Sequence, residues 1–367
     1  MGNKKLTEDK IIYQLKTNRY FRHELTYENH FWFFQLFLSH YITYPMANFH
    51  KEIFTLTQKL KYKLICIMAF RGSGKSTIMN LSYVLWSILG KPQKKFIIIV
   101  SKRKHQARAH FENIKRELET NELLKNDMGP FKAESDDQGS NFIEIKKFNA
   151  KIMMISARQG IRGLRYGINR PDLIVLDDIE DNLSMENNRE QRQIYEWFMS
   201  EVIPSGDANT TIIVLGNRLK GESLLTKLEK EIKAGNISGI FHTYPIVNDR
   251  GQILWLGKFP NKEIIKNLYD KTSDMESWMQ EYALISKYEL LIETQKLNRF
   301  LFDTESKKMG GKTETMTIPK QKNIINRFGF DIKYLKLEDG DNGSKTLFRQ
   351  YLKILEIINK DNNSLRY

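Results

Sequence analysis

The chain has 367 residues and a formal net charge of +14, from 58 Lys and Arg against 44 Asp and Glu. Its hydrophobic fraction of 41% and aromatic fraction of 11% exclude a largely disordered chain, which would bury too little apolar surface to offset its ordering entropy. The positive charge favours polyanionic partners, nucleic acid first and an anionic membrane second. A basic surface that only keeps the protein soluble is the alternative.

Cysteine content and the N-terminal segment bear on the compartment. A single cysteine, Cys66, excludes an internal disulfide and a cysteine-rich zinc site, and fits a reducing cytoplasm. The apolar stretch at residues 31–38 is shorter than the roughly 20 residues of a membrane helix. Charged residues 3–10 do not resemble a signal peptide. We therefore expect a soluble protein of the host cell cytoplasm, with no membrane partner.

Strand and helix patterns alternate along most of the chain. Short aliphatic runs predict buried strands at residues 64–69, 96–100, 151–155, 173–176 and 211–215. Residues 76–89 and 105–118 space their apolar side chains as helices do. This alternation predicts an α/β fold with a mainly parallel sheet flanked by helices. Residues 134–155 instead predict a hairpin that turns at Asn149-Ala150.

A glycine-containing loop follows the first predicted strand and precedes a predicted helix, which is the context of a Walker A motif. Glycines let backbone N–H groups turn toward phosphate oxygens, and the helix N-terminus adds donors and partial positive charge. Lys75 is expected on the terminal phosphates of ATP, and Ser76 on Mg²⁺. Ala69 replaces the motif's first glycine, so an unrelated glycine-rich turn is the alternative. The predicted nucleotide-binding residues are Gly72, Ser73, Gly74, Lys75, Ser76 and Thr77.

The strand at residues 173–176 delivers carboxylates to the same sheet edge, because parallel strands end together. Asp177 is the expected Mg²⁺ ligand, in the manner of a Walker B motif. Asp178 occupies the position where related ATPases hold a glutamate that orients the attacking water, but its side chain is one methylene shorter. Glu180 therefore remains an alternative for that role. Without a Walker A motif, the same acidic run would fit a solvated turn.

Three further polar segments are candidates for contact with phosphates. Gly216-Asn217-Arg218 ends the last predicted strand and could sense the γ-phosphate. Arg71, inside the phosphate loop, could reach that phosphate in cis or face solvent. Lys102-Arg103-Lys104 opens a predicted helix, where cations oppose the helix dipole, and this hints at an anionic ligand or at plain surface lysines.

A second arginine cluster lies in the glycine-rich loop of residues 158–167. Arg162 or Arg165 could complete the nucleotide site of a neighbouring subunit, or contact DNA. A solvated loop is the alternative interpretation.

Together these segments resemble the large terminase subunit of tailed phages, the ATPase that drives viral DNA into preformed capsids. The most specific match is residues 160–181, which is similar to the family's arginine-glycine loop and Walker B block. Residues 71–77, 45–52 and 278–282 agree with it, and the resemblance covers about residues 40–335.

Several expectations come from the resemblance alone. It implies a RecA/ASCE-like P-loop NTPase fold, with His50 near the adenine pocket, Asp178 as the catalytic carboxylate and Asn217 in a coupling motif. It also implies ATP and Mg²⁺ as cofactors, and double-stranded DNA, a phage portal and a small terminase subunit as partners. A homo-oligomeric ring, transiently at the procapsid, is the expected active state.

The expected domains combine the resemblance with the sequence pattern, in which a mostly helical stretch follows Lys220 and residues 306–322 are rich in Lys, Thr and Gly. They are an N-terminal helical region (1–44), a P-loop ATPase core (45–220), a lid subdomain (221–305), a linker (306–322) and the truncated start of an RNase H-like nuclease domain (323–367). Asp331 resembles that nuclease's first aspartate, but too few residues follow for the remaining ligands. We therefore expect ATPase activity and no DNA cleavage by this chain alone.

Two other functions fit the same motifs. One is a helicase-like or mobile-element ATPase that remodels DNA differently. The other is an inactive prophage remnant that binds DNA without turning over ATP. Lys75, Ser76 and Asp177 argue against decay of the site, whereas the short C-terminal region favours a fragment.

Overall fold

The computed structural model describes residues 8–58, 62–131, 133–134, 141–182, 187–219, 222–248, 251–272 and 275–285. The expected linker and the nuclease-like segment with Asp331 lie outside these residues. The chain divides into two compact units. The first comprises Met1–Met68, Gly72–Gly216 and Glu222–His242, and the second comprises Ala69–Arg71, Asn217–Gly221 and Thr243–Tyr367.

One sheet organises the strands, in the order β3-β4-β5-β2-β6-β7-β1-β8. From β5 to β1 all neighbouring strands are parallel, while β3, β4 and β5 pair antiparallel. The predicted α/β fold class, with a mainly parallel sheet flanked by helices, is therefore confirmed. The strands are β1 (Leu64–Ala69), β2 (Phe96–Ser101), β3 (Ala133–Glu134), β4 (Phe142–Ile145), β5 (Ala150–Ser156), β6 (Leu173–Asp177), β7 (Thr211–Gly216) and β8 (Ile240–Tyr244).

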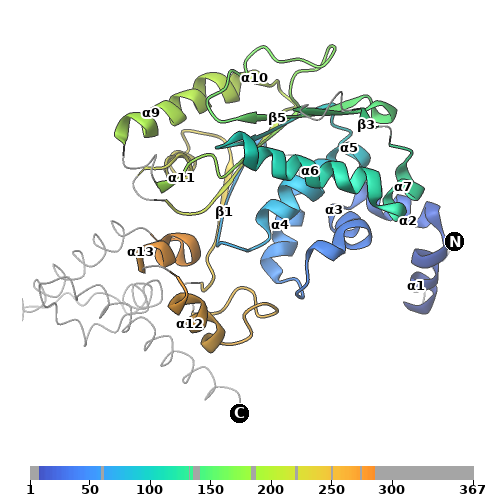
Figure 1. Cartoon of the computed structure of the whole chain (residues 1–367), viewed down its shortest axis with the longest axis horizontal. Helices are drawn as coiled ribbons and strands as arrows, with labels where there is room; N and C mark the ends of the chain where they lie inside the picture. Colours follow the sequence, from blue (N-terminus) through green and yellow to red (C-terminus); the bar gives the residue numbers. More distant parts are fainter. Residues whose placement is uncertain are drawn as a thin grey trace, which may run out of the picture. The chain divides into compact units, whose positions relative to one another are not determined.

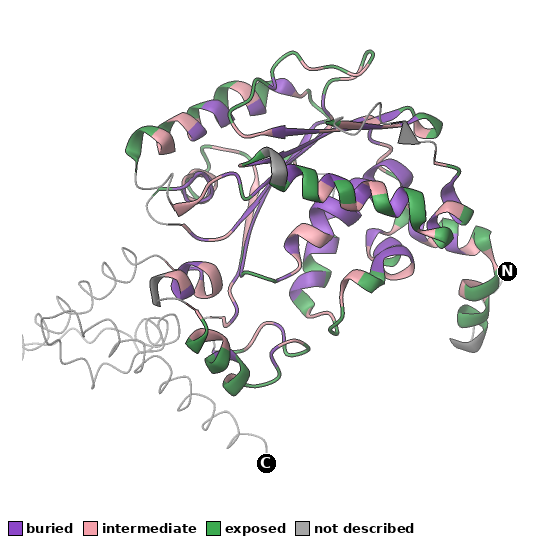
Figure 2. Cartoon of the chain, in the orientation of Figure 1, coloured by how far each residue is buried: buried purple, intermediate pink, exposed green. Residues whose placement is uncertain are grey.

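Helices cover both faces of the sheet (Figure 1). Because of this cover, every residue of β1, β2, β6 and β7 is buried, as Figure 2 shows, and their sequences are almost purely aliphatic. One face carries α4 (Asn48–Gln58), the π-helical segment η3 (Thr77–Tyr83), α5 (Val84–Leu89) and α6 (Lys104–Thr120). The other carries α9 (Asn188–Trp197) and α11 (Leu224–Lys233).

The hairpin and the connections also follow the sequence pattern. Asn149 turns the β4–β5 hairpin in a left-handed conformation, φ 45°, which asparagine tolerates better than most residues. Short helical segments complete the connections: η4 (Lys146–Phe148), η5 (Phe198–Val202) and α10 (Ile203–Ser205).

The N-terminal part of the first unit is helical and buries the apolar stretch noted in the sequence. Phe33, Phe34, Phe37 and Leu38 are at most 2% exposed, so this stretch belongs to the core. Among the residues that the structure describes, none of the helices combines the length and apolarity needed to cross a bilayer. The segments are α1 (Glu8–Thr17), α2 (Arg19–Glu28), α3 (His30–Phe33), η1 (Phe34–Leu38), η2 (Ser39–Tyr41) and α7 (Glu122–Met128).

Within the described residues of the second unit, irregular chain surrounds α12 (Lys262–Asp270), α13 (Met275–Trp278) and η6 (Met279–Ala283). The Phe70 amide donates to the Tyr244 carbonyl at 3.0 Å, and the Phe70 ring contacts Phe259 edge-on. Helix α11 belongs to the first unit. The expected domain boundaries remain predictions.

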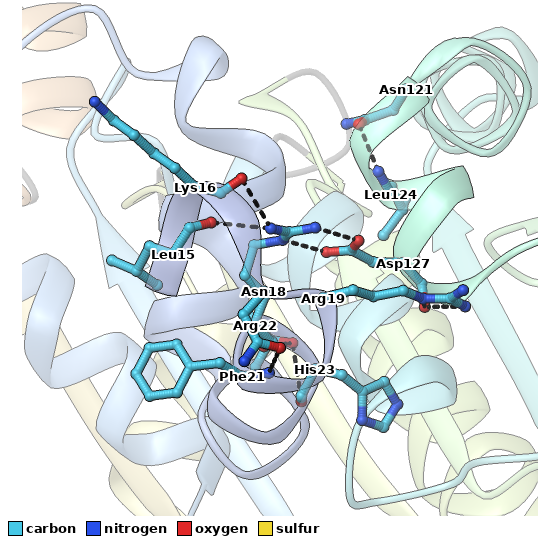
Figure 3. A network of polar contacts seen from close by, with 11 residues as sticks. Leu15, Lys16, Asn18, Arg19, Phe21, Arg22, His23, Asn121, Leu124 and Asp127 are labelled. Atoms are coloured by element: carbon cyan, nitrogen blue, oxygen red, sulfur yellow. Dashed lines mark hydrogen bonds and ion pairs between the residues drawn. The ribbon is translucent and has the colours of Figure 1, made fainter. Parts of the chain in front are cut away.

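A buried ion pair ties α2 to α7 (Figure 3). The Arg22 guanidinium donates to both Asp127 carboxylate oxygens, Nε to Oδ2 at 2.6 Å and Nη2 to Oδ1 at 2.7 Å. The Asp127 side chain is fully buried, and Arg22 Nη1 donates a hydrogen bond to the Leu15 carbonyl at 3.0 Å. Such bidentate pairs are strong, but neither charge tolerates loss of its partner in a dry environment.

Removing one partner of this pair should destabilise the first unit more than removing both. Asp127→Ala should lower the free energy of unfolding by about 3–5 kcal/mol, because it leaves the Arg22 charge buried and unpaired. The double variant Arg22→Met, Asp127→Leu should lose clearly less free energy of unfolding, because no buried charge is left unpaired. Urea unfolding measures this, with Glu28→Gln as control, since the Lys91–Glu28 pair is exposed and contributes little to stability. Equal losses in the single and double variants would contradict the expectation.

Candidate functional site

The loop after β1 adopts the conformation that its glycines permit. Gly72 and Gly74 have φ values of 73° and 85°, a region that other residues enter only with strain. The helix begins at once: the Ile78 amide donates to the Gly74 carbonyl at 3.0 Å. Ser73 and Lys75 are 1% and 6% exposed, whereas Ser76 and Thr77 are half-buried. The predicted strand–loop–helix context is present.

His50 of α4 makes a hydrogen bond to the backbone of this loop. Its Nδ1 accepts a hydrogen bond from the Ala47 amide at 2.9 Å, so the ring proton must lie on Nε2. Nε2 therefore donates to the Ser73 carbonyl, 2.8 Å away. His50 is fully buried, and these bonds tie it to the loop backbone. A place near adenine, implied by the resemblance, stays a prediction.

Asp177, at the end of β6, is the most enclosed carboxylate of the site. Its Oδ2 accepts a hydrogen bond from Asn80 Nδ2 at 2.5 Å and lies 3.3 Å from His110 Nε2. Ser76 lies close enough to lower the pKa of this carboxylate. Burial, and next the charge of Asp178, raise the pKa of Asp177 to about 6, although Lys75 and His110 oppose the rise. The two predicted motifs therefore meet in the first unit.

The donor set fits a magnesium ion. Mg²⁺ in nucleotide sites takes one or two carboxylates, and substrate phosphates and water supply its other oxygens. Among the described residues, buried Asp177 Oδ1 has no hydrogen-bond partner, whereas Oδ2 accepts the Asn80 amide and lies 3.3 Å from His110 Nε2. Ser76 adds a hydroxyl from the adjoining helix turn. An orphaned buried oxygen of this kind costs free energy unless a cation or water satisfies it.

The two candidates for orienting water differ in their surroundings. Asp178 is exposed and has a left-handed backbone, φ 46°, and its amide donates to the Leu215 carbonyl of β7 at 3.2 Å. Glu180 Oε2 instead accepts the Leu224 amide at 2.7 Å, at the N-terminus of α11. Burial raises the pKa of Glu180 to about 7. Within the described part of the chain, the Glu180 side chain is engaged by a backbone amide and no side-chain partner is seen for Asp178, which favours Asp178 for this role.

Other predicted residues are placed as follows. The Arg71 guanidinium donates to both Glu281 carboxylate oxygens at 2.9 Å, within the second unit. Asn217 follows directly after β7 and is half-buried. Lys102 pairs with Asp181, and Arg103 Nη2 lies 4.0 Å from that carboxylate. The basic cluster after β2 thus has a counter-charge in the protein, which weakens the argument that it needs an anionic ligand.

The arginine loop lines a cavity of about 220 Å³. No hydrogen bond or ion pair engages the guanidiniums of Arg162, Arg165 or Arg170 within the part of the chain that the structure describes. Three cations around one cavity repel each other unless an anion lies between them. Sites that enclose a whole small ligand measure roughly 300–1,000 Å³, so this cavity suits a phosphate group better than a nucleoside.

Asn80 and His110 were not expected in the site. Asn80 could have been suspected, since it is a polar residue amid Ile78, Met79 and Leu81 on the helix after the phosphate loop. It lies in η3, and π-helical segments occur often at functional sites. His110 gives no such signal, because the distance between α6 and β6 is set by the tertiary fold.

Comparison with known proteins points to one group of solved structures. No family model and no curated protein matches the chain. The large terminase of bacteriophage HK97 is similar at 14% identity and a TM-score of 0.44, over 83% of this chain and 54% of its own. The large terminase of a thermophilic bacteriophage, in complex with ADP, is similar at 11% identity and a TM-score of 0.44, over 66% and 53%.

A third similar structure is the large terminase ATPase domain of Thermus phage P74-26, at 14% identity and a TM-score of 0.41. Its match covers 63% of this chain and 91% of that domain. This chain thus spans about half the length of the two longer terminases.

The shifted pKa of Glu180 predicts a pH dependence of stability. Because its folded pKa of about 7 exceeds the ordinary value of 4.5, the folded state holds this proton more tightly than the unfolded state does. The resulting stabilisation is full below about pH 4.5 and is lost as pH rises through 7. Glu180→Gln keeps an oxygen for the Leu224 amide and should flatten this decline. Urea unfolding between pH 5 and 8 measures it; parallel curves for the two proteins would refute the assignment.

Proposed function

We propose that the chain is an ATP-hydrolysing motor that translocates double-stranded viral DNA into a procapsid, as a terminase large subunit does. The observation that carries the ATPase part is the junction of the phosphate loop with Asp177. Gly72 and Gly74 have the left-handed backbone of a phosphate-binding turn, Lys75 and Ser76 open the helix, and both residues act on the buried Asp177 carboxylate, whose pKa they lower. This combination suits a nucleoside triphosphate with a divalent cation.

Each residue then has a distinct role in hydrolysis. Backbone amides of residues 72–77 bind the phosphates, and Lys75 neutralises charge on the terminal ones. Ser76 and Asp177 hold Mg²⁺, which when bound offsets the charge that develops on the transferred phosphoryl group. Asp178 orients the attacking water, with Glu180 as the competing candidate. The left-handed backbone of Asp178 fits a residue placed for function at some cost in strain.

The DNA-packaging part rests on charge and on the resemblance. The charge of +14 favours a polyanion, and the resemblance of residues 160–181 to the terminase block specifies which kind of motor. Three arginines that need an anion line one cavity in that block. We propose an active ring of subunits, in the cytoplasm and at the procapsid, with a portal and a small subunit as partners. Arg162 would act on the nucleotide of a neighbouring subunit, and Asn217 would belong to the coupling motif.

ATP turnover tests the proposal directly. The wild-type protein should hydrolyse ATP with Mg²⁺ and do so faster with double-stranded DNA. Lys75→Ala should abolish turnover, and Asp178→Asn should lower kcat by a factor on the order of 10²–10⁴, the usual contribution of a positioned acid or base. Glu180→Gln serves as the matched comparison and should retain far more activity.

The outcomes separate the alternatives. Absence of hydrolysis in wild type would favour an inactive DNA-binding remnant, and DNA-independent hydrolysis would contradict a DNA motor. Strand displacement on a forked duplex would favour a helicase-like enzyme. A larger loss in Glu180→Gln than in Asp178→Asn would exchange the roles of the two carboxylates.

Action between subunits predicts complementation. Arg162→Ala and Lys75→Ala should each be inactive alone, but their mixture should regain activity, because a Lys75→Ala subunit can still supply Arg162 to its neighbour's intact phosphate loop. An arginine acting this way contributes roughly 10³–10⁵ to kcat. Arg158→Ala is the control on the same loop, since that side chain pairs with Glu190 and Gln193. A mixture as inactive as its components would exclude action in trans.

A further inference from the structure

The two oxygens of Asp177 lie in different surroundings. Oδ2 accepts the Asn80 amide at 2.5 Å and has His110 Nε2 at 3.3 Å. Oδ1 is equally buried but has no hydrogen-bond partner among the described residues, and neither has Asn80 Oδ1. Among the described residues, protein side chains therefore contact Oδ2 of this carboxylate and leave Oδ1 without a polar partner.

The two nitrogens near Oδ2 come from different helices. Asn80 lies in η3, directly after the phosphate loop, and is fully buried. His110 lies on α6, and its side chain is 28% exposed. Both helices cover the same face of the sheet and contact each other, so Oδ2 is approached from two elements of one packed layer.

Chemistry supports the orientation of the Asn80 amide. An ionised carboxylate only accepts hydrogen bonds, so it must face the nitrogen of the amide and not its oxygen. A flipped Asn80 would bring two oxygens close together in the place of this hydrogen bond. The hydrogen bond therefore fixes the orientation of the Asp177 carboxylate, with Oδ2 toward Asn80.

We propose that Asn80 and His110 are positioning residues that hold Oδ2 of Asp177, so that Oδ1 is the oxygen offered to the divalent cation of the bound nucleotide. The inference rests on the proposed function, because it assumes that Asp177 serves a metal–nucleotide complex. It adds that this carboxylate binds through one oxygen, and that two residues outside both motifs decide which one. Residues that orient metal ligands in this way typically affect metal affinity about 10–100-fold.

Metal affinity, separate from turnover, provides the test. Mn²⁺ replaces Mg²⁺ because electron paramagnetic resonance detects it directly. The concentration of Mn²⁺ that half-saturates the ADP-loaded protein should rise about 10–100-fold in Asn80→Leu, which keeps the size but not the amide. ADP affinity in EDTA should change less than about threefold, since Asn80 serves the metal ligand only. His110→Ala should raise the Mn²⁺ requirement less, and His110→Gln, which keeps an N–H donor, should restore it.

Ser82→Ala is the matched control. Ser82 is buried on the same π-helical segment and bonds His30, not Asp177, so this variant loses a buried contact without touching the carboxylate. The proposal is overturned if Asn80→Leu melts like Ser82→Ala and its Mn²⁺ requirement rises less than about threefold. Should Asn80→Leu fail to fold, the His110 pair decides: equal Mn²⁺ requirements in His110→Ala and His110→Gln overturn the proposal. A wild type that binds no Mn²⁺–ADP would overturn the proposed function as well.

Discussion

Burial of the Asp177 carboxylate is the constraint on which the site depends. A charge at the end of a strand with no solvent exposure is costly unless partners compensate it. Lys75 and Ser76 from the phosphate-loop helix, Asn80 one turn further and His110 from α6 supply that compensation. The pKa of Asp177 still rises to about 6, so compensation is incomplete without a further cation. Under the proposed function, folding and nucleotide chemistry therefore act on the same atoms.

Sheet register brings these groups together. Strand β7 lies between β1 and β6, with Met68 opposite Gly216 and Asp177 opposite Leu215. The ends of these parallel strands therefore meet at one edge, where a ligand can reach both motifs. Gly216 also lets α11 approach closely, because a Cβ there would lie 2.7 Å from Leu225 Cδ1. At the N-terminus of the same helix, the Leu224 amide donates a hydrogen bond to the Glu180 carboxylate.

Local patterns predicted much of this arrangement. All five aliphatic runs are strands, and four of them, β1, β2, β6 and β7, are buried throughout, as strands covered on both faces must be. The strand–loop–helix context of residues 64–83, with left-handed Gly72 and Gly74, followed from the glycines and their position after a strand. The order of the strands did not follow, since pairing between distant segments leaves no local signature. For the same reason the Arg71–Glu281 pair and the contact between His110 and Asp177 were missed.

The backbone conformation at Asp178 restricts which residue types fit this position. With φ at 46°, this position lies in the left-handed region, which aspartate and asparagine enter far more readily than longer or branched residues. Glutamate lacks the short reach that lets a side chain bond its own backbone there. The shorter acid after β6, which set this chain apart from the pattern of related ATPases, is thus what this turn tolerates best. The carboxylate's reach is then set by this turn, and a longer acid would extend that reach at a cost in backbone strain.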